Sequence, residues 1–203
     1  MRTLFLFFFL FSNFVFSQKK KKTLDVVSNI EAKVIIMKPV GNNFLAKTME
    51  PFYGFGFSGN LMTPINFGIG LDYNMLFTNV KAEQINVYGN LGAPKMTNIE
   101  LYLTHRDKLS EEFSLEEMAG FSYYRLVTTL FDDKNHKFND GGMGFNLGGK
   151  LIYTVDLEGY QQIFISGKAN FYYSDVYNEN PEIRKFFSRS TLLSLSVGYR
   201  YNF

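Results

Sequence analysis

The chain has 203 residues and a formal net charge of +2, and 46% of its residues are hydrophobic. This length suits one domain, and so balanced a charge gives no reason to expect nucleic acid or another strongly charged partner. The chain has no cysteine, which excludes disulfides, thiolate nucleophiles and thiolate metal ligands. Mean hydropathy is −0.10. Transmembrane β-strands also give such a value, because the apolar and polar residues that alternate along them average out.

Residues 1–17 predict a secretory signal peptide. A short basic start precedes the apolar stretch Leu4–Phe16, and the small residue Ser17 follows it. The apolar stretch is shorter than the roughly 20 residues that a membrane-spanning helix needs. Residues 18–29, which include the basic run Lys19–Lys22, are predicted to form a periplasmic tether. Two interpretations of these lysines stay open, a solvated segment and a contact with anionic lipid headgroups.

From Ile30 onwards, apolar and polar residues alternate in about eight segments. Successive side chains of a strand point to opposite sides. In the last segment, Leu193 and Leu195 therefore share one face, and Ser194 and Ser196 share the other. This pattern is typical of a transmembrane barrel strand, with lipid on one side and the lumen on the other. The predicted strands are Ile30–Lys38, Phe52–Gly59, Ile65–Phe77, Ile99–Thr104, Phe113–Thr128, Gly142–Val155, Gln161–Ser174 and Thr191–Phe203.

Two of these segments depart from the pattern. In the first, Ile35 and Met37 interrupt the face that should be polar. In the fifth, Glu117 and Arg125 share the parity of the apolar residues and do not belong in hydrocarbon. Either the two charged residues lie at the membrane interfaces and extend their polar ends toward water, or a bulge shifts the register between them.

The connections between the predicted strands alternate in length. Those after the first, third, fifth and seventh strands are long or strongly polar, and those after the second, fourth and sixth are shorter. With the N-terminus in the periplasm, all long loops then lie outside, as in bacterial outer-membrane barrels. We predict an all-β fold in which residues 30–203 form a closed antiparallel barrel of about eight strands in the outer membrane. Closure is expected because every backbone donor and acceptor must be paired in lipid.

The polar faces carry a set of ionisable residues that this fold would place in the lumen. The interior of an eight-stranded barrel is just wide enough to be filled by side chains, so charges there must pair or be hydrated. We predict a structural charge network, and a narrow ion path or gate is the alternative. Strand order suggests that Glu116 neighbours Lys150 and that Lys168 neighbours Arg200. The residues of the predicted network are Asp72, Glu100, Glu116, Lys150, Lys168 and Arg200.

The sequence carries no recognisable catalytic constellation. Its two histidines are His105, in a predicted charged turn, and His136, in a predicted outer loop, and neither has an identifiable serine partner. No phosphate-binding motif, zinc-ligand pair or nucleophile elbow is present. We therefore expect no enzyme activity, cofactor or metal site. The sequence does not identify a small-molecule ligand.

The end of the chain carries a resemblance to a known class. Tyr199, Tyr201 and Phe203 resemble the C-terminal signal by which outer-membrane barrels are handed to their insertion machinery. Together with the signal peptide and the alternating strands, they make the chain similar to the small outer-membrane β-barrel family of Bacteroidota, of OmpA-type or PorT-like architecture. The resemblance implies a fold, an outer-membrane location in the lipid bilayer and the barrel-insertion machinery as a partner, but no particular activity.

We expect a non-enzymatic structural or surface-interaction role. The alternatives are an accessory component of an envelope secretion or assembly system, a narrow pore, and a soluble lipocalin-like barrel that binds a ligand. The soluble barrel stays open because alternation also occurs there. A polar face rich in glycine, serine and asparagine nevertheless favours a lumen over a water-exposed surface.

Overall fold

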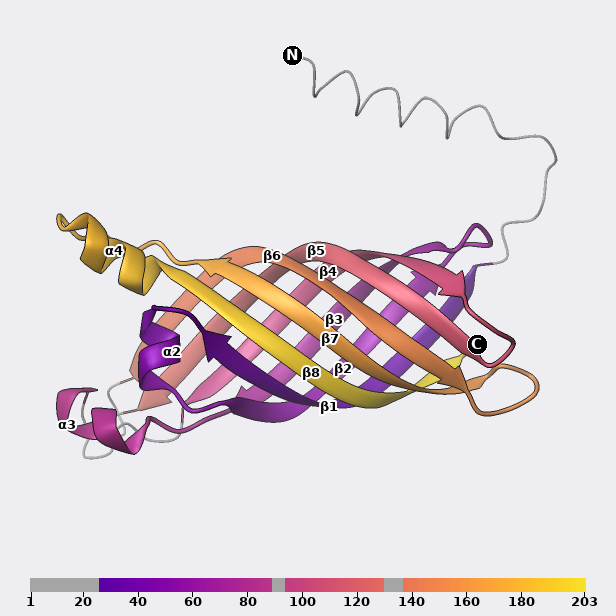
Figure 1. Ribbon diagram of the computed structural model, residues 1–203, viewed down its shortest axis with the longest axis horizontal. Coiled ribbons are helices and arrows are strands. Elements are labelled where there is room, and N and C mark those ends of the chain that lie inside the picture. Colours follow the sequence, from indigo (N-terminus) through magenta and orange to yellow (C-terminus); the bar gives the residue numbers. More distant parts are fainter. Residues whose placement is uncertain (1–25, 89–93, 130–136) are drawn as a thin grey trace, which may run out of the picture.

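The computed structural model describes residues 26–88, 94–129 and 137–203, in which eight strands form a closed antiparallel barrel (Figure 1). Each strand pairs with the next one in sequence, and β8 pairs with β1 to close the sheet. The predicted fold class is therefore confirmed. The predicted signal peptide and Lys19–Lys22 lie outside the described residues. The strands are β1 (Val27–Val40), β2 (Phe52–Met62), β3 (Phe67–Phe77), β4 (Lys95–Lys108), β5 (Phe113–Thr129), β6 (Lys137–Thr154), β7 (Gln161–Tyr173) and β8 (Arg189–Asn202).

The pairing is regular in the two strands that depart from the sequence pattern. β1 pairs with β2 from Val27 onwards, so it begins inside the stretch predicted as a tether. Its Ile35 and Met37 point into the barrel, where both are buried. Glu117 and Arg125 of β5 are exposed on the outside, and β5 pairs with β4 and β6 without a bulge. Of the two explanations offered for these charges, the structure therefore supports the interfacial one.

The two ends of the barrel differ in their connections. The short connections 63–66, 109–112 and 155–160 lie at one end, here called the turn end. The long connections lie at the other, the loop end, and carry the helices (Figure 1). This is the predicted alternation of loop lengths. β4 extends to Lys108, so His105 lies in a strand and not in the predicted turn. The helices are α2 (Phe44–Thr48), η1 (Ala82–Gln84), α3 (Ile85–Tyr88) and α4 (Pro181–Ser188).

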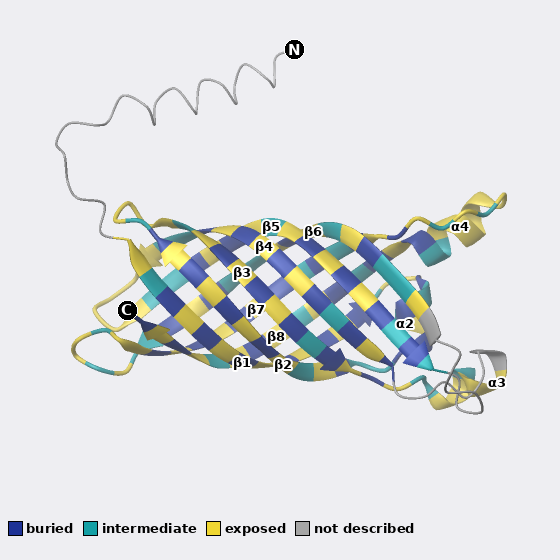
Figure 2. Cartoon of the chain, turned by 180° about the vertical axis from the view of Figure 1, so that it is seen from behind, coloured by how far each residue is buried: buried dark blue, intermediate teal, exposed yellow. Residues whose placement is uncertain are grey.

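The outer face of the barrel is apolar and the inner face is largely polar. Outward Val34 and Phe121 are 66% and 75% exposed, whereas inward Asn98 and Asn146 are fully buried. Figure 2 shows this alternation of buried and exposed positions along the strands. A lipocalin-like barrel has the reverse arrangement, and so extensive an apolar exterior would aggregate in water. The soluble alternative is therefore excluded.

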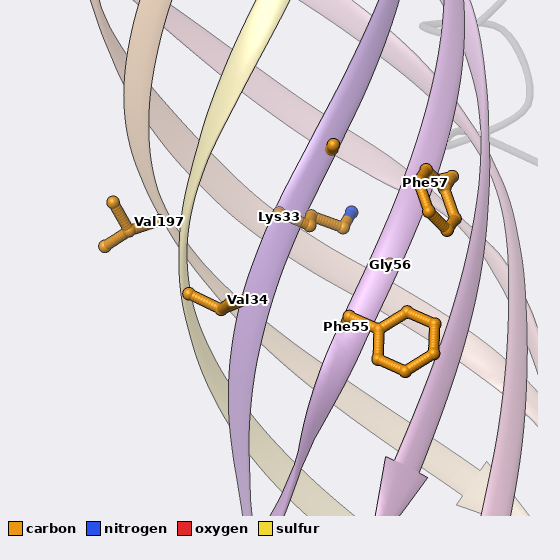
Figure 3. A pocket seen from close by; sticks show the side chains of 7 residues that line it. Lys33, Val34, Phe55, Gly56, Phe57 and Val197 are labelled. Atoms are coloured by element: carbon orange, nitrogen blue, oxygen red, sulfur yellow. The ribbon is translucent and has the colours of Figure 1, made fainter.

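The apolar exterior is continuous across neighbouring strands. Around Gly56, the outward side chains of Val34, Phe55, Phe57 and Val197 border a shallow apolar groove (Figure 3). These side chains come from β1, β2 and β8, which are adjacent in the sheet. The inward positions Lys33 and Gly56 also line this groove. None of the helices in the described residues has the length and apolar character needed to cross a bilayer.

Candidate functional site

The barrel lumen contains a cluster of ionisable side chains, here called the lumen charge network. The network comprises four carboxylates and four cations, so its formal charge is zero. All of these residues are buried. They come from every strand except β2, because each lies on the inward face of its own strand. The members are Glu31, Lys33, Asp72, Glu100, Glu116, Lys150, Lys168 and Arg200.

Arg200 organises the part of the network nearer the turn end. Its Nη1 and Nη2 donate to the two carboxylate oxygens of Glu116, each at 2.7 Å, and its Nε donates to Glu31 Oε1 at 2.7 Å. The Nζ atom of Lys150 lies 2.6 and 2.8 Å from the oxygens of Glu31. Arg106, which is partly exposed, donates from Nε to Glu116 at 2.7 Å. Bidentate pairing of this kind fixes geometry as well as charge.

Asp72 organises the second part of the network. Its Oδ2 accepts hydrogen bonds from Lys33 Nζ and Lys168 Nζ, both at 2.6 Å. Lys168 also donates to Glu100 Oε2 at 2.7 Å. The hydroxyl of Tyr102 lies 2.9 Å from Asp72 Oδ1. Each carboxylate here therefore has a cation in direct contact, which is the condition under which buried charges are tolerated.

A polar bridge joins the two parts. The hydroxyl of Tyr102 lies 2.7 Å from Asn60 Oδ1, and Asn60 donates from Nδ2 to Asn29 Oδ1 at 2.8 Å. The same Nδ2 is 3.3 Å from Glu31 Oε1. Tyr102 and Asn60 thus connect the two parts of the lumen charge network into one set.

Glycines make room for the large members of this set. Tyr102 faces Gly70 on β3 and Gly120 on β5 in the strand register. A Cβ atom added at Gly120 would lie 2.6 Å from the Tyr102 Cβ and closer still to the backbone of β4. Lys168 faces Gly148 in the same way. The glycine-rich polar faces of the sequence therefore reflect close packing between inward side chains of neighbouring strands.

An apolar cluster occupies part of the lumen at the loop end. Leu45 of α2 and the following Met49 are 1% and 2% exposed, and they join a cluster of buried apolar side chains from the strands. α2 is held there by its cap, in which Asn43 Oδ1 accepts from the backbone N–H of Ala46 at 2.9 Å. Lys81 ties the next loop to it by donating to the carbonyl of Ala46 at 2.7 Å. The connection between β1 and β2 is thus folded into the mouth of the barrel as an apolar plug. The strand residues of the cluster are Ile35, Met37, Phe52, Leu76, Met96, Tyr124, Leu126, Tyr172 and Leu192.

The structure buries all six residues that the sequence assigned to the lumen, but it pairs them differently in part. Glu116 and Lys150 face each other in the register of β5 and β6, with Nζ and Oε2 3.7 Å apart. Lys168 and Arg200 are not neighbours, because Lys168 faces Ser194 and Arg200 faces Gln162. The prediction that Lys168 neighbours Arg200 is therefore wrong. Lys168 instead contacts Asp72 and Glu100, and Arg200 contacts Glu31 and Glu116.

Sequence reasoning missed several members of the set. Glu31 and Lys33 alternate with Ile30, Ala32 and Val34, so their parity alone would have placed them inside. Ile35 and Met37 have the same parity, so this face of the strand does not read as polar in the sequence. The sequence predicts a turn at Arg106, but this residue lies in β4.

His105, which the sequence places in a charged turn, lies on the exterior of the barrel at the turn end. His105 Nδ1 is 3.1 Å from Glu117 Oε2 and 3.8 Å from Asp107 Oδ2. These three side chains are close enough to share a metal ion, but Asp107 and Glu117 are exposed and the histidine already has a hydrogen-bond partner. They form a solvated polar group apart from the lumen. His136 lies outside the described residues.

The C-terminal aromatic residues also point outward. Tyr199, Tyr201 and Phe203 are 43%, 39% and 64% exposed. The rings of Tyr201 and Phe203 are 5.3 Å apart, and Tyr160 stacks on Tyr201 at 6.3 Å. The group forms an aromatic patch at the turn end, where the edge of a transmembrane barrel meets the interface. Its role as an insertion signal stays a prediction.

The fold is shared with outer-membrane proteins of known structure. No protein-family model matches the sequence, and no curated protein sequence matches it. A major outer membrane protein from Thermus thermophilus is similar at a TM-score of 0.65 and 10% identity, over 88% of this chain and 100% of that one. Neisserial surface protein A gives a TM-score of 0.61 at 14% identity, over 87% and 97%. Ail, the attachment invasion locus protein of Yersinia pestis, gives 0.55 at 9% identity, over 87% and 98%.

These similarities define the class to which the chain belongs. It is an eight-stranded transmembrane β-barrel of the outer-membrane type. An antiparallel barrel with an apolar exterior and a polar lumen is the architecture of outer-membrane proteins, and the outer membrane is accordingly where this protein lies. At 9–14% identity the comparisons support the fold and no particular activity.

Proposed function

We propose that this protein is a non-enzymatic, non-conducting barrel that anchors and presents its loop end at the cell surface. The observation that carries the proposal is the filling of the lumen. The lumen charge network occupies the part nearer the turn end, and the α2 plug with its apolar cluster occupies the loop end. These two layers support both the structural role of the barrel and the absence of conduction through its lumen.

The two layers oppose ion passage in different ways. A permeating ion would have to break short contacts such as those of Arg200 with Glu116 and of Lys168 with Asp72. Breaking one buried pair is strongly unfavourable because it leaves an uncompensated charge. The apolar cluster around Leu45 adds a second barrier at the loop end. The narrow pore expected as an alternative is therefore disfavoured.

The loop end supplies the surface for interaction. α4 projects beyond the barrel (Figure 1), and its Ile183 is 43% exposed, while Tyr177 in the preceding loop is 89% exposed. The rings of Phe187 in α4 and Phe44 in α2 lie 5.3 Å apart, which connects the projecting helix to the plug. Two of the similar structures are named a surface protein and an attachment invasion protein. Exposed loops on a rigid scaffold are the usual place for recognition.

Two measurements test this proposal. In planar bilayers, we expect the purified protein to give no stepwise increases in ionic conductance. Conductance steps of a regular size would overturn the proposal that the barrel does not conduct. In intact cells, a membrane-impermeant lysine reagent should label Lys185 on α4 and leave Lys108 at the turn end unlabelled. The reverse labelling would overturn the orientation that we propose.

We also propose that the aromatic patch of Tyr199, Tyr201 and Phe203 is recognised by the barrel-insertion machinery. Its position at the end of β8, next to the β1–β8 seam where the sheet closes, supports this role. Substituting Phe203 by Ser should slow membrane insertion in cells but leave the stability of the inserted barrel unchanged. The Bacteroidota family that the sequence resembles is likewise our proposal for its lineage, supported by the strand pattern and this aromatic end.

A further inference from the structure

The outward-facing charges of the barrel are segregated by sign. The cations lie at the ends of strands nearest the loop end, and here they are called the rim cations. Asp107 and Glu117 lie at the turn end. Between these levels, the outward positions of the described strands carry no charged side chain. The rim cations are Lys38 on β1, Lys95 on β4, Arg125 on β5 and Arg189 on β8, and all of them are exposed.

Their position corresponds to a membrane interface. A cation on the lipid face is least tolerated at the bilayer midplane and much better tolerated near the interface. Aromatic residues lie at the same level: Phe77 faces Lys95 in the register, and Tyr173 faces Arg189. Such aromatic residues mark the headgroup region. The rim cations therefore lie where the lipid headgroups of one leaflet begin.

Their charge is not neutralised by the described part of the chain. Lys95 Nζ lies 5.8 Å from the centre of the Phe77 ring, and Arg125 Nη2 donates to the neutral amide of Asn139 at 3.3 Å. Neither these two nor Lys38 and Arg189 form an ion pair with a described carboxylate. Glu117 at the other end, by contrast, contacts His105.

We propose that the rim cations bind the phosphate groups of anionic lipids in the leaflet at the loop end. Lysine and arginine both bind phosphate, and arginine does so with two parallel hydrogen bonds. The outward strand positions at the turn end carry Asp107 and Glu117 and no described lysine or arginine, so we expect no comparable phosphate contact in the other leaflet. The barrel thus selects phosphate-rich lipid on one side only. This inference rests on the membrane-spanning placement and is independent of whether the lumen conducts.

The test measures lipid preference directly. Protein purified from outer membranes is placed in phosphatidylcholine vesicles that contain a trace of spin-labelled phosphatidic acid or spin-labelled phosphatidylcholine. Electron paramagnetic resonance then gives the fraction of each label that is immobilised on the barrel. We expect phosphatidic acid to be preferred by roughly fivefold, the factor that one cation at an anionic surface supports. The preference should fall as salt is raised, because the rim is exposed.

Two variants separate the rim from general charge. K38Q/K95Q/R125Q/R189Q removes the rim cations, and K47Q/K108Q/R184Q/K185Q removes the same charge from positions away from the rim. Loss of the preference in the first variant and its retention in the second would support the proposal. An unchanged preference in the rim variant, or no preference in the unsubstituted protein, would overturn it. If the rim variant shows no heat-dependent gel shift, and so has not folded, K38Q/R189Q and K95Q/R125Q are measured in its place.

A competition experiment distinguishes binding of lipid phosphate from binding of free phosphate. Inorganic phosphate added at constant ionic strength should leave the preference for phosphatidic acid unchanged, because the rim is proposed to bind lipid at the interface. Displacement of the lipid by free phosphate would overturn the assignment to lipid. The gel shift and the conductance test report on barrel formation and closure, so a failure here is distinguishable from a failure of the proposed function.

Discussion

Arg200 on β8 holds Glu116 on β5 through two parallel hydrogen bonds of 2.7 Å, across the lumen of the barrel. The strands that carry these residues are not neighbours in the sheet. The same guanidinium also contacts Glu31, its register partner on the adjacent strand β1, so the β1–β8 seam is joined to β5 on another part of the wall. Arg200 is fully buried, and it therefore cannot exchange these partners for water without opening the barrel.

Removing this cation should destabilise the barrel strongly. In R200Q, Glu31 and Glu116 lose their shared guanidinium, and the cations that still contact them are Lys150 and Arg106. We expect a loss of about 3–5 kcal/mol in the free energy of unfolding, as for other broken buried ion pairs. The measurement is urea-dependent unfolding in lipid vesicles, read from the heat-dependent gel shift. R184Q on α4 is the control and should change stability by no more than about 0.5 kcal/mol; equal effects of the two variants would contradict a structural role for Arg200.

The partners of Asp72 predict a rescue. In D72N, Lys33 keeps only the Ser58 hydroxyl at 3.1 Å, whereas Lys168 keeps Glu100 at 2.7 Å. The cost should therefore come largely from the stranded Lys33. We expect the double variant K33M/D72N to be about 1–3 kcal/mol more stable than D72N alone, which is the range of coupling between contacting residues. The same urea titration measures it, and K168M/D72N serves as the comparison that should not be rescued, because it strands both Lys33 and Glu100.

The glycines that face Tyr102 should not tolerate a methyl group. In G120A, the new Cβ would overlap with Tyr102 and with the backbone of β4, so a strand must shift. We expect a loss of about 1–3 kcal/mol from overpacking. G59A is the matched control, since a Cβ there would meet nothing within 4 Å. Comparable stability of G120A and G59A would show that the lumen is less tightly filled than the structure indicates.

The α2 plug should be separable from the barrel. L45D places a charge in the apolar cluster at the loop end, where Leu45 is 1% exposed. A buried unpaired charge is strongly unfavourable, so α2 should leave the lumen while the strands stay paired. We expect trypsin to cleave after Lys47 faster in this variant, with the heat-dependent gel shift retained. N42D, at an exposed position before the helix, should leave the cleavage rate unchanged.

The strands and their two faces were predictable from the sequence because side chains alternate with a period of two. Leu193, Leu195 and Val197 fall on the outer face of β8 as their parity required. The alternation of long and short loops was also predictable, since the number of residues between two predicted strands is read directly from the chain. The inward position of Glu31 and Lys33 was also available from parity, although Ile35 and Met37 on the same face concealed it.

The pairing of charges across the lumen was decided only by the tertiary structure. Parity says which face a residue occupies, but its depth along the axis depends on the stagger between strands, which no single strand encodes. This stagger separates Lys168 from Arg200 and brings Arg200 to Glu116. The position of the α2 plug was also decided by the tertiary structure. Leu45 and Met49 have an apolar site to pack into only because the closed barrel brings Ile35, Leu76 and Leu192 together at the loop end. The sequence by itself thus determined the barrel and its faces, and tertiary closure determined how its interior is filled.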